Sequence, residues 1–323
     1  MERLDAFMAR ANAAYYATHD PFRDFTTAPE ITQVFGEILG LWAAVTWEAM
    51  GRPSPVLLAE CGPGRGTLMA DARRAIARVA PAFHAALRLH LVESSPRLRS
   101  IQASLLPGAT WHDTLASFPP GPLLLIANEF LDALPIRQFV RRGAGWSERH
   151  VTDGAFVERP ATGPDRPAAD GDIVERNEPA LALVATLARR LAAEQGAALF
   201  LDYGPAESAP GDSLQAIRAG APADPLAESG SADLTAHVDF AALAQAAIHA
   251  GAAVHGPIPQ GLFLSRLGLF QRSGQLARTQ PPARAATLMQ AAQRLAEPTR
   301  MGRLFKVLCV CHPSLPTPAG FQP

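Results

Sequence analysis

The chain contains very little lysine. Of its 29 basic residues only Lys306 is a lysine, and 30 acidic residues bring the formal net charge to −1. This balance gives no overall charge that would draw the chain to nucleic acid or to an anionic membrane. No apolar run approaches the roughly 20 residues that a membrane-spanning helix needs. We therefore expect neither nucleic-acid binding nor membrane insertion.

Cysteine is also scarce, and no targeting segment is apparent. Cys61, Cys309 and Cys311 are too few and too irregularly spaced to predict a disulfide framework. The first twenty residues lack the apolar core of a secretory signal, and their acidic residues argue against an organellar presequence. These observations predict a reducing, cytoplasmic location.

Most of the chain consists of apolar segments separated by turn residues, and hydrophobic residues make up 48% of it. Strands are predicted at residues 56–61, 87–92, 110–111, 122–128, 197–202 and 303–310. Helices are predicted at residues 67–79, 96–105, 179–194 and 240–250. Strands that alternate with helices predict a parallel, doubly wound α/β sheet.

The segments outside this alternation define the expected domain organisation. Residues 1–52 are predicted to form a helical cap, with a helix that starts near Thr27 and Pro29 and continues to Val45. Residues 53–323 are predicted to form one catalytic-type domain. Its insertions are hairpins at about 136–160, an irregular loop at 204–230 and helices at about 262–296.

A glycine-rich turn after the first predicted strand is the most informative motif. Gly62, Gly64 and Gly66 lie between that strand and a helix, where backbone N–H groups favour a polar or anionic ligand. A phosphate-binding P-loop needs a lysine here, and none precedes residue 306. A dinucleotide fold prefers glycine or alanine where Thr67 stands. Sites for S-adenosylmethionine (SAM) have the pattern E/D-x-G-x-G-x-G, which Glu60 to Gly66 match; a plain tight turn is the alternative.

Two further acids follow the next strands. Glu93 stands where a carboxylate can accept bonds from both ribose hydroxyls of a nucleoside. The alternative is a glutamate at the start of the helix that contains Pro96. Asp113 follows the third strand and could accept a bond from an adenine amino group, or it could be a solvated loop acid.

Four blocks of the sequence, spread over most of the chain, resemble one known family. They are residues 24–37 (DFTTAPEITQVFGE), 62–71 (GPGRGTLMAD), 127–135 (ANEFLDALP) and 233–240 (DLTAHVDF). The family is that of the MidA-like SAM-dependent methyltransferases, whose mitochondrial members are complex I assembly factors. The resemblance implies a class I methyltransferase fold, a Rossmann-like doubly wound sheet, with SAM as cofactor. It also implies a protein acceptor, in a respiratory complex I subunit or a similar protein, with symmetric dimethylarginine as product. The chain is shorter than the family pattern around Arg23, within a block that could close over the acceptor.

The residues after the strand at 122–128 are the candidates for catalysis. In a doubly wound sheet, ligands bind beyond the carboxyl ends of the strands. This places Asn128, Glu129 and Asp132 near the transferred methyl group. Our hypothesis is that Glu129, with Asp132 or Glu30, grips the guanidinium of an acceptor arginine. The alternative is an acid cluster that caps a helix.

Other residues give weaker signals. Residues 202–204 could line the pocket, and Thr235, His237 and Asp239 could either approach the acceptor or cap the next helix. Cys309, Cys311 and His312 have metal-ligand spacing, but buried strand cysteines are the better interpretation, so no metal site is expected. Two other functions stay open at this point: a SAM-binding assembly factor or chaperone with little catalysis, and a nicotinamide-dependent oxidoreductase.

Overall fold

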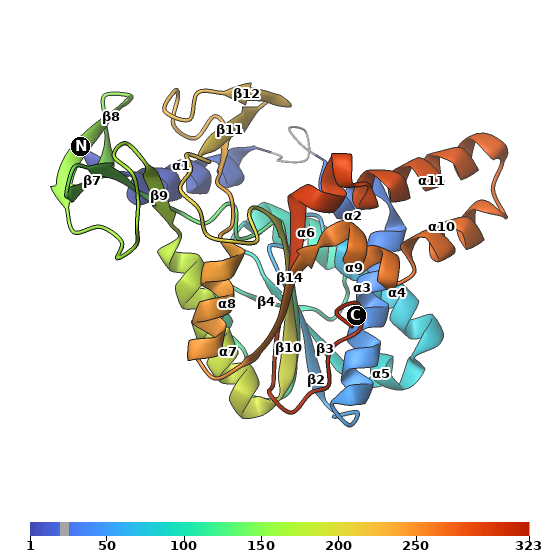
Figure 1. The fold of residues 1–323 in the computed structure, drawn as a ribbon. Helices are drawn as coiled ribbons and strands as arrows, with labels where there is room; N and C mark the ends of the chain where they lie inside the picture. The colour runs from blue at the N-terminus through green and yellow to red at the C-terminus, as the bar shows by residue number, and fades with distance from the viewer. Residues whose placement is uncertain (20–25, 323) are drawn as a thin grey trace.

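The computed structural model describes residues 1–19 and 26–322. Arg23 and the shortened loop around it lie outside the described residues. A seven-stranded sheet forms the centre of the molecule (Figure 1). Its strand order is β4 (Thr110–His112), β3 (Leu87–Val92), β2 (Val56–Cys61), β5 (Leu123–Asn128), β10 (Gly196–Tyr203), β15 (Phe305–Cys311) and β14 (Ala253–Pro259), with β14 and β4 at the edges.

The sheet is mixed, so the prediction of a parallel sheet is wrong at one edge. The five strands from β4 to β10 pair in parallel, whereas β15 pairs antiparallel with both β10 and β14. Strand β14 was not predicted, because Gly256 and Pro257 interrupt its pattern, and its register shifts between His255 and Ile258. All the strands except β15 therefore run in the same direction, and the carboxyl ends of these six strands lie at one edge of the sheet.

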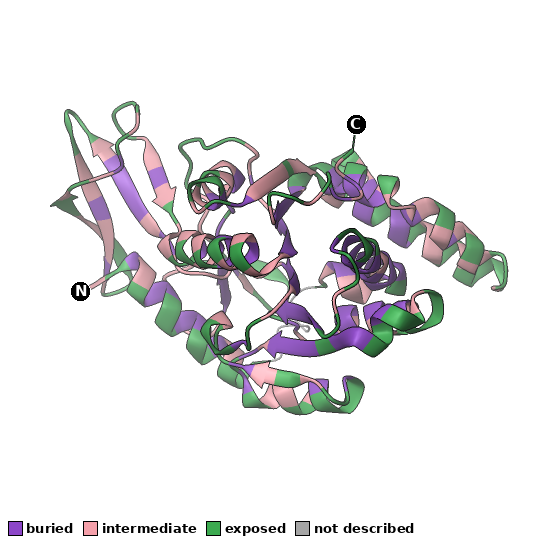
Figure 2. Ribbon diagram, turned by 90° about the horizontal axis from the view of Figure 1, so that it is seen from below, coloured by how far each residue is buried: buried purple, intermediate pink, exposed green. Residues whose placement is uncertain are grey.

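Helices cover both faces of the sheet, which explains why β2 and β5 are apolar throughout rather than alternating. One face packs against α3 (Gln33–Ala49), α4 (Thr67–Val79), α5 (Pro81–Ala86), α9 (Gln260–Arg266), α10 (Leu269–Ala277) and α11 (Pro282–Ala296). The other face packs against α7 (Glu178–Glu194) and α8 (Phe240–His249). Helix α6 (Pro96–Leu105) connects β3 to β4. Figure 2 shows the buried inward sides and exposed outward sides of these helices.

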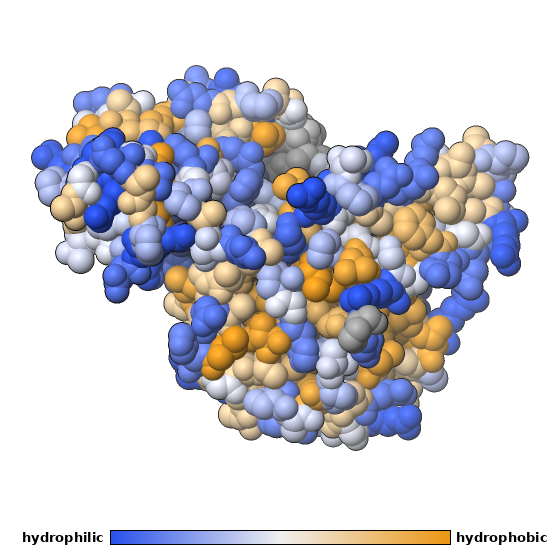
Figure 3. Space-filling model, in the orientation of Figure 1, coloured by the Kyte–Doolittle hydropathy of each residue, from blue (hydrophilic) through white to orange (hydrophobic). Residues whose placement is uncertain are grey.

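A second layer lies above the carboxyl ends of the strands (Figure 1). Its larger sheet contains β1 (Glu2–Arg3), β7 (Gly145–Thr152), β6 (Arg137–Arg142) and β9 (Ile173–Arg176), with β8 (Ala155–Ala161) paired to β7. Its smaller sheet contains β12 (Ala221–Ala223), β11 (Gln215–Arg218) and β13 (Asp233–Thr235). The predicted irregular loop at 204–230 therefore contains two strands, β11 and β12, which sheet pairing stabilises against weak local propensity. Hydrophilic residues predominate on this layer in Figure 3.

The N-terminal segment contributes to both layers rather than forming one cap. Helix α1 (Leu4–Thr18) packs its apolar side against the upper layer, whereas α3 packs against the central sheet. The helix predicted from Thr27 to Val45 is broken at Thr32, whose backbone is extended. The hydroxyl of Thr32 accepts the N–H of Val34 at 3.3 Å and caps α3, which leaves α2 (Ala28–Ile31) as a separate short helix.

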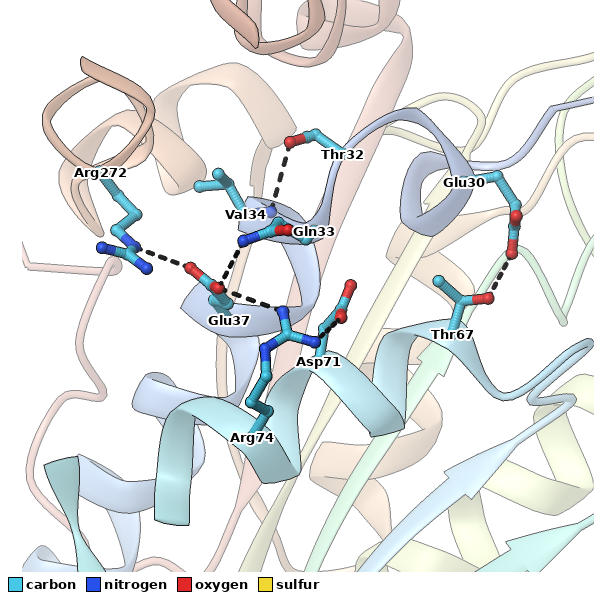
Figure 4. Close-up of polar contacts among 9 residues, drawn as sticks. All are labelled: Glu30, Thr32, Gln33, Val34, Glu37, Thr67, Asp71, Arg74 and Arg272. Atoms are coloured by element: carbon cyan, nitrogen blue, oxygen red, sulfur yellow. Dashed lines mark hydrogen bonds and ion pairs between the residues drawn. The ribbon is translucent and has the colours of Figure 1, made fainter. Parts of the chain in front are cut away.

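The helical hairpin α10–α11 projects from the body and is tied to it by a buried carboxylate. Glu37 of α3 accepts bonds from Gln33 at 3.0 Å, Arg74 at 3.3 Å and Arg272 at 2.7 Å (Figure 4). Arg74 also pairs with Asp71 at 2.7 Å. Because Arg272 belongs to α10, this network fixes the inserted hairpin to α3 and α4.

Candidate functional site

A cavity of about 520 Å³ lies at the carboxyl ends of β2, β3 and β5, roofed by α1 and α2. Its size is typical of a small-molecule or cofactor site. Eight of the ten site residues predicted from the sequence line it, namely Glu30, Glu60, Gly62, Gly64, Glu93, Asp113, Asn128 and Glu129. Gly66 and Asp132 do not.

The glycine turn has a backbone that other residues rarely adopt. Gly62, Gly64 and Gly66 have φ angles of 63°, 55° and 85°. A Cβ atom on Gly62 would lie 2.8 Å from Cδ2 of Phe130, so the turn also needs glycine for close packing. Gly66 is the N-cap residue of α4, which explains why it is required without touching the cavity. The turn exposes its backbone to whatever the cavity holds.

Two residues of the cavity lining each have a buried side-chain oxygen without a hydrogen-bond partner among the described residues. These oxygens are Oε2 of Glu60, in a residue 3% exposed, and Oδ1 of Asn128, in a residue 7% exposed. Burial raises the pKa of Glu60 to about 8. Orphaned buried acceptors of this kind suit a ligand that brings hydrogen-bond donors and positive charge.

Glu93 keeps free acceptor capacity towards the cavity. Its Oε1 accepts the N–H of Ser95 at 2.8 Å, and its Oε2 accepts a bond from Gln102 at 3.2 Å. The backbone N–H of Ser94 also bonds to this carboxylate. Because a carboxylate can accept about four hydrogen bonds, acceptor capacity is left for a ligand hydroxyl. Burial raises the pKa of Glu93 above its ordinary value. Asp113 is different, because its side chain is 84% exposed at the cavity rim and pairs with Arg99 at 2.5 Å.

Gln102 is a contributor that the sequence did not reveal. It is fully buried, and its Nε2 donates to the carbonyl of Gly64 at 2.7 Å and to Glu93. Its Oε1 accepts the indole N–H of Trp111 at 2.7 Å. One amide thus connects the glycine turn, the acid after β3 and strand β4. Its only sequence signal was a place on the predicted helix at 96–105.

Glu129 is held in a constrained position between β5 and α2. Its φ angle is 49°, and its Oε1 accepts the N–H of Ala28 and the side-chain amide of Asn128, both at 3.0 Å. Burial raises its pKa despite these two bonds. Glu30 lines the same cavity and accepts a bond from the hydroxyl of Thr67 at 2.5 Å (Figure 4). Two carboxylates, from α2 and from the end of β5, therefore face one cavity.

Asp202 does not line this cavity, contrary to the prediction, and instead holds the turn that carries Glu129. It is 1% exposed, and its Oδ2 accepts the N–H groups of Phe130, Leu131 and Asp132 at 3.2, 3.0 and 3.3 Å. Its Oδ1 accepts the N–H of Tyr203 at 2.9 Å. Burial raises its pKa to about 7. The neighbouring strands β5 and β10 place it beside the turn.

Asp132, predicted to partner Glu129, belongs to a buried cluster outside the cavity. Tyr203 hydrogen-bonds to it, and burial together with the nearby Asp202 and Asp233 raises its pKa well above the ordinary value. Its side chain is therefore part of the packing between β10 and the upper layer. Of the two acids predicted to act with Glu129, Glu30 lines the cavity and Asp132 does not.

The weaker candidates lie elsewhere. His237 and Asp239 line a second cavity of about 570 Å³, and Asp239 caps α8 by accepting the N–H of Ala242 at 3.0 Å. Thr235 is buried in β13. Cys309 and Cys311 are buried in β15 as free cysteines. Within the described ranges, no group of three metal-ligating side chains is arranged for a metal ion, and no helix is long and apolar enough to cross a membrane.

The sequence resembles known methyltransferases. The profile of a family described as "Putative S-adenosyl-L-methionine-dependent methyltransferase" matches residues 38–258. The mitochondrial protein arginine methyltransferase NDUFAF7 homolog of Drosophila melanogaster is 33% identical, over 96% of this chain and 80% of its own. The mitochondrial protein arginine methyltransferase NDUFAF7 of Homo sapiens is also 33% identical, over 94% of this chain and 78% of its own.

Two solved structures from Burkholderia thailandensis have the same fold. An uncharacterized protein superposes with a TM-score of 0.81 at 28% identity, covering 99% of this chain and 89% of its own. A second protein, bound to S-adenosyl-homocysteine, superposes with a TM-score of 0.77 at 26% identity, covering 99% and 88%. The likeness therefore extends over both layers of the molecule.

Proposed function

Because this chain belongs to a family of SAM-dependent methyltransferases, we propose that it methylates arginine in a protein acceptor, a subunit of respiratory complex I or a similar protein. The class I methyltransferase fold, the SAM cofactor and the methyltransferase activity follow from the family and from the structural relatives. The identity of the methyl acceptor is the part that we propose. Relatives named as protein arginine methyltransferases support it.

The position of Glu129 carries the proposal. This half-buried carboxylate lies in the same cavity as the glycine turn, Glu60 and Glu93, with Glu30 as a second acid. An arginine guanidinium arrives as a cation, because its pKa is above about 12, and carboxylates orient its planar fork through charge-assisted hydrogen bonds. The cavity thus has anionic groups where a cationic acceptor would meet the cofactor.

The residues divide the work of the reaction. Bound SAM supplies an electrophilic methyl group on its sulfonium. The glycine turn, Glu60 and Glu93 would hold the cofactor. Glu129 would orient one guanidinium nitrogen towards the methyl group and receive the proton that this nitrogen loses. Its raised pKa suits that second role.

The cavity also bears on the alternatives. An N-terminal segment that filled the cavity would favour a SAM-binding assembly factor without catalysis. Instead α1 and α2 leave about 520 Å³ open beside Asn128 and Glu129. This favours turnover. A nicotinamide-dependent oxidoreductase is not supported, because the family and the related structure involve SAM or its product.

The test is Glu129→Gln, assayed with radiolabelled SAM and a recombinant complex I subunit. The amide keeps the shape of the side chain but removes its charge and its basicity. We expect methyl transfer to fall by about 10³-fold while S-adenosylhomocysteine binding by calorimetry is unchanged. Glu175→Gln, the same change outside this cavity, is the matched control and should leave both quantities unaltered. Retained transfer in Glu129→Gln would refute the assignment.

A further inference from the structure

The cavity lining falls into two groups that lie in different parts of the sequence. One group follows β2, β3 and β4 and contains the cofactor-binding candidates. The other contains residues of α1 together with the segment after β5: Ala9, Asn12, Ala13, Tyr16, Ala17, Ala133, Leu134 and Pro135. We call these the cofactor half and the acceptor half of the cavity. Asn128 and Glu129, which come at the end of β5, are assigned to neither half.

Helix α1 lies along the cavity and is held in place by hydrogen bonds at two points. Its Asn12 donates to the carbonyls of Ala133 at 3.0 Å and Leu234 at 2.8 Å, and accepts the N–H of Leu234 at 3.0 Å. At the far end of the helix, the carbonyl of His19 accepts a bond from Arg97 of α6 at 2.6 Å. The helix is thus tied to the upper layer on one side and to α6 on the other.

The two sides of α1 have different environments. Leu4, Phe7, Met8 and Ala11 are buried against the upper layer. Ala9, Ala13 and Ala17 recur every four residues, so they form one stripe, and this stripe faces the cavity. All three are exposed, so nothing in the described chain covers them.

Asn128 stands at the edge of this group. It lines the same cavity and is 7% exposed, and its buried Oδ1 has no hydrogen-bond partner among the described residues. Tyr16, also on α1, lines the cavity, and its hydroxyl donates to Asp233 at 2.8 Å. The acceptor half therefore has small apolar walls and an aromatic residue, in a cavity that also contains the acids Glu30 and Glu129.

We propose that the Ala9–Ala13–Ala17 stripe is the wall of the channel through which the acceptor side chain reaches the methyl group. The chemistry of the channel fits a long side chain with an apolar stem and a cationic head, carried on a protein segment that lies along α1. The small alanine side chains leave room for the apolar part of the acceptor side chain, and Glu30 and Glu129 bind its cationic group. The inference rests on the proposed function, since it assigns the path of the same acceptor.

The experiment compares Ala13→Trp with Ala6→Trp in the full-length chain. Both residues are exposed on α1, but only Ala13 lines the cavity, so the cost to the helix is matched. Methyl transfer from labelled SAM to a recombinant complex I subunit and S-adenosylhomocysteine affinity are measured for each. Ala17→Leu, a smaller change in the same stripe, gives a second reading if Ala13→Trp folds poorly.

Ala13→Trp should lower kcat/KM for the protein acceptor by about tenfold or more, mainly through KM, with S-adenosylhomocysteine affinity within twofold of wild type. Ala6→Trp should change neither quantity. A kcat/KM within twofold of wild type in both Ala13→Trp and Ala17→Leu would overturn the channel. A parallel loss of S-adenosylhomocysteine affinity would also overturn it, because α1 would then wall the cofactor half. Absence of arginine methylation by the wild-type chain would instead refute the proposed function, and the channel with it.

Discussion

The two halves of the cavity are built in different ways. The cofactor half comes from the ends of three strands and their following turns, between Glu60 and Asp113, so its residues lie close in sequence. The acceptor half joins α1 to the segment at 133–135, more than a hundred residues away, and is held there by Asn12 and by β13. The cofactor half can therefore be read from short motifs, whereas the acceptor half depends on long-range packing.

The largest expected effect comes from breaking the cofactor half at its glycine turn. Gly64→Val places a branched side chain at a φ of 55°, in the backbone that lines the cavity. We expect SAM and S-adenosylhomocysteine affinity to fall by about 100-fold or more, with activity lost in parallel. Calorimetry measures this directly. Gly145 lies in the hairpin of the upper layer, where a Cβ atom would meet the carbonyl of Arg142 at 3.9 Å, an ordinary contact, so Gly145→Val should bind normally.

The second-largest expected effect should separate the rate of methyl transfer from cofactor binding. Asp202→Ala leaves three N–H groups of the 130–132 turn without their acceptor, so Glu129 should lose its fixed position. We expect kcat to fall by about 10- to 100-fold with S-adenosylhomocysteine affinity nearly unchanged. Asp202→Asn, whose amide oxygen can still accept, should recover part of the loss. Asp239→Ala removes a comparable cap from α8 and should spare kcat. A larger loss of cofactor affinity than of kcat in Asp202→Ala would contradict this division.

A smaller effect should stay within the cofactor half. Gln102→Leu keeps the size of the side chain but removes its bonds to Gly64, Glu93 and Trp111. We expect SAM affinity to fall by about tenfold, because the glycine turn and Glu93 lose their common support. At saturating SAM, kcat should be close to that of wild type. A reduced kcat with normal SAM affinity would contradict this prediction, because Gln102 would then support the acceptor half rather than the cofactor half.

The smallest effect concerns pH. In the ligand-free fold the pKa of Glu60 is about 8, above its ordinary value of 4.5. A raised pKa favours the folded state below the unfolded value, and that contribution is lost as pH rises from about 4.5 to about 8. Glu60→Gln removes this loss. Thermal unfolding should therefore show the variant a few degrees more stable than wild type at pH 8.5, with the difference shrinking towards pH 5. A constant difference across this range would contradict the assignment.

The comparison of the halves also explains what the sequence could predict. Glu60, Gly62, Gly64 and Glu93 were predicted from local pattern and all line the cavity, because a strand–turn–helix unit places its residues with little help from the rest of the chain. Glu129 was predicted from its place after the strand at 122–128, with Glu30 as a possible partner, and both line the cavity. Their individual roles at the cofactor and the acceptor remain predictions.

The failures share a physical cause. Asp132 and Asp202 were expected at the cavity. Instead, Asp132 is buried between β10 and the upper layer, and Asp202 accepts backbone N–H groups of the turn after β5. Strand β14 and strands β11 and β12 were missed because sheet pairing overrides weak local preference. Asn12 on α1 gave no signal, since its role depends on β13, more than two hundred residues later.

The measurement that tests the central claim most directly is the identity of the methylated atom. The wild-type chain is incubated with isotopically labelled SAM and a recombinant complex I subunit, and the product is mapped by tandem mass spectrometry. The account predicts label on the guanidino nitrogens of arginine, as symmetric dimethylarginine, and its loss in Glu129→Gln. Label on a lysine, a carboxylate or a small molecule, or SAM binding without transfer to any protein, would contradict it.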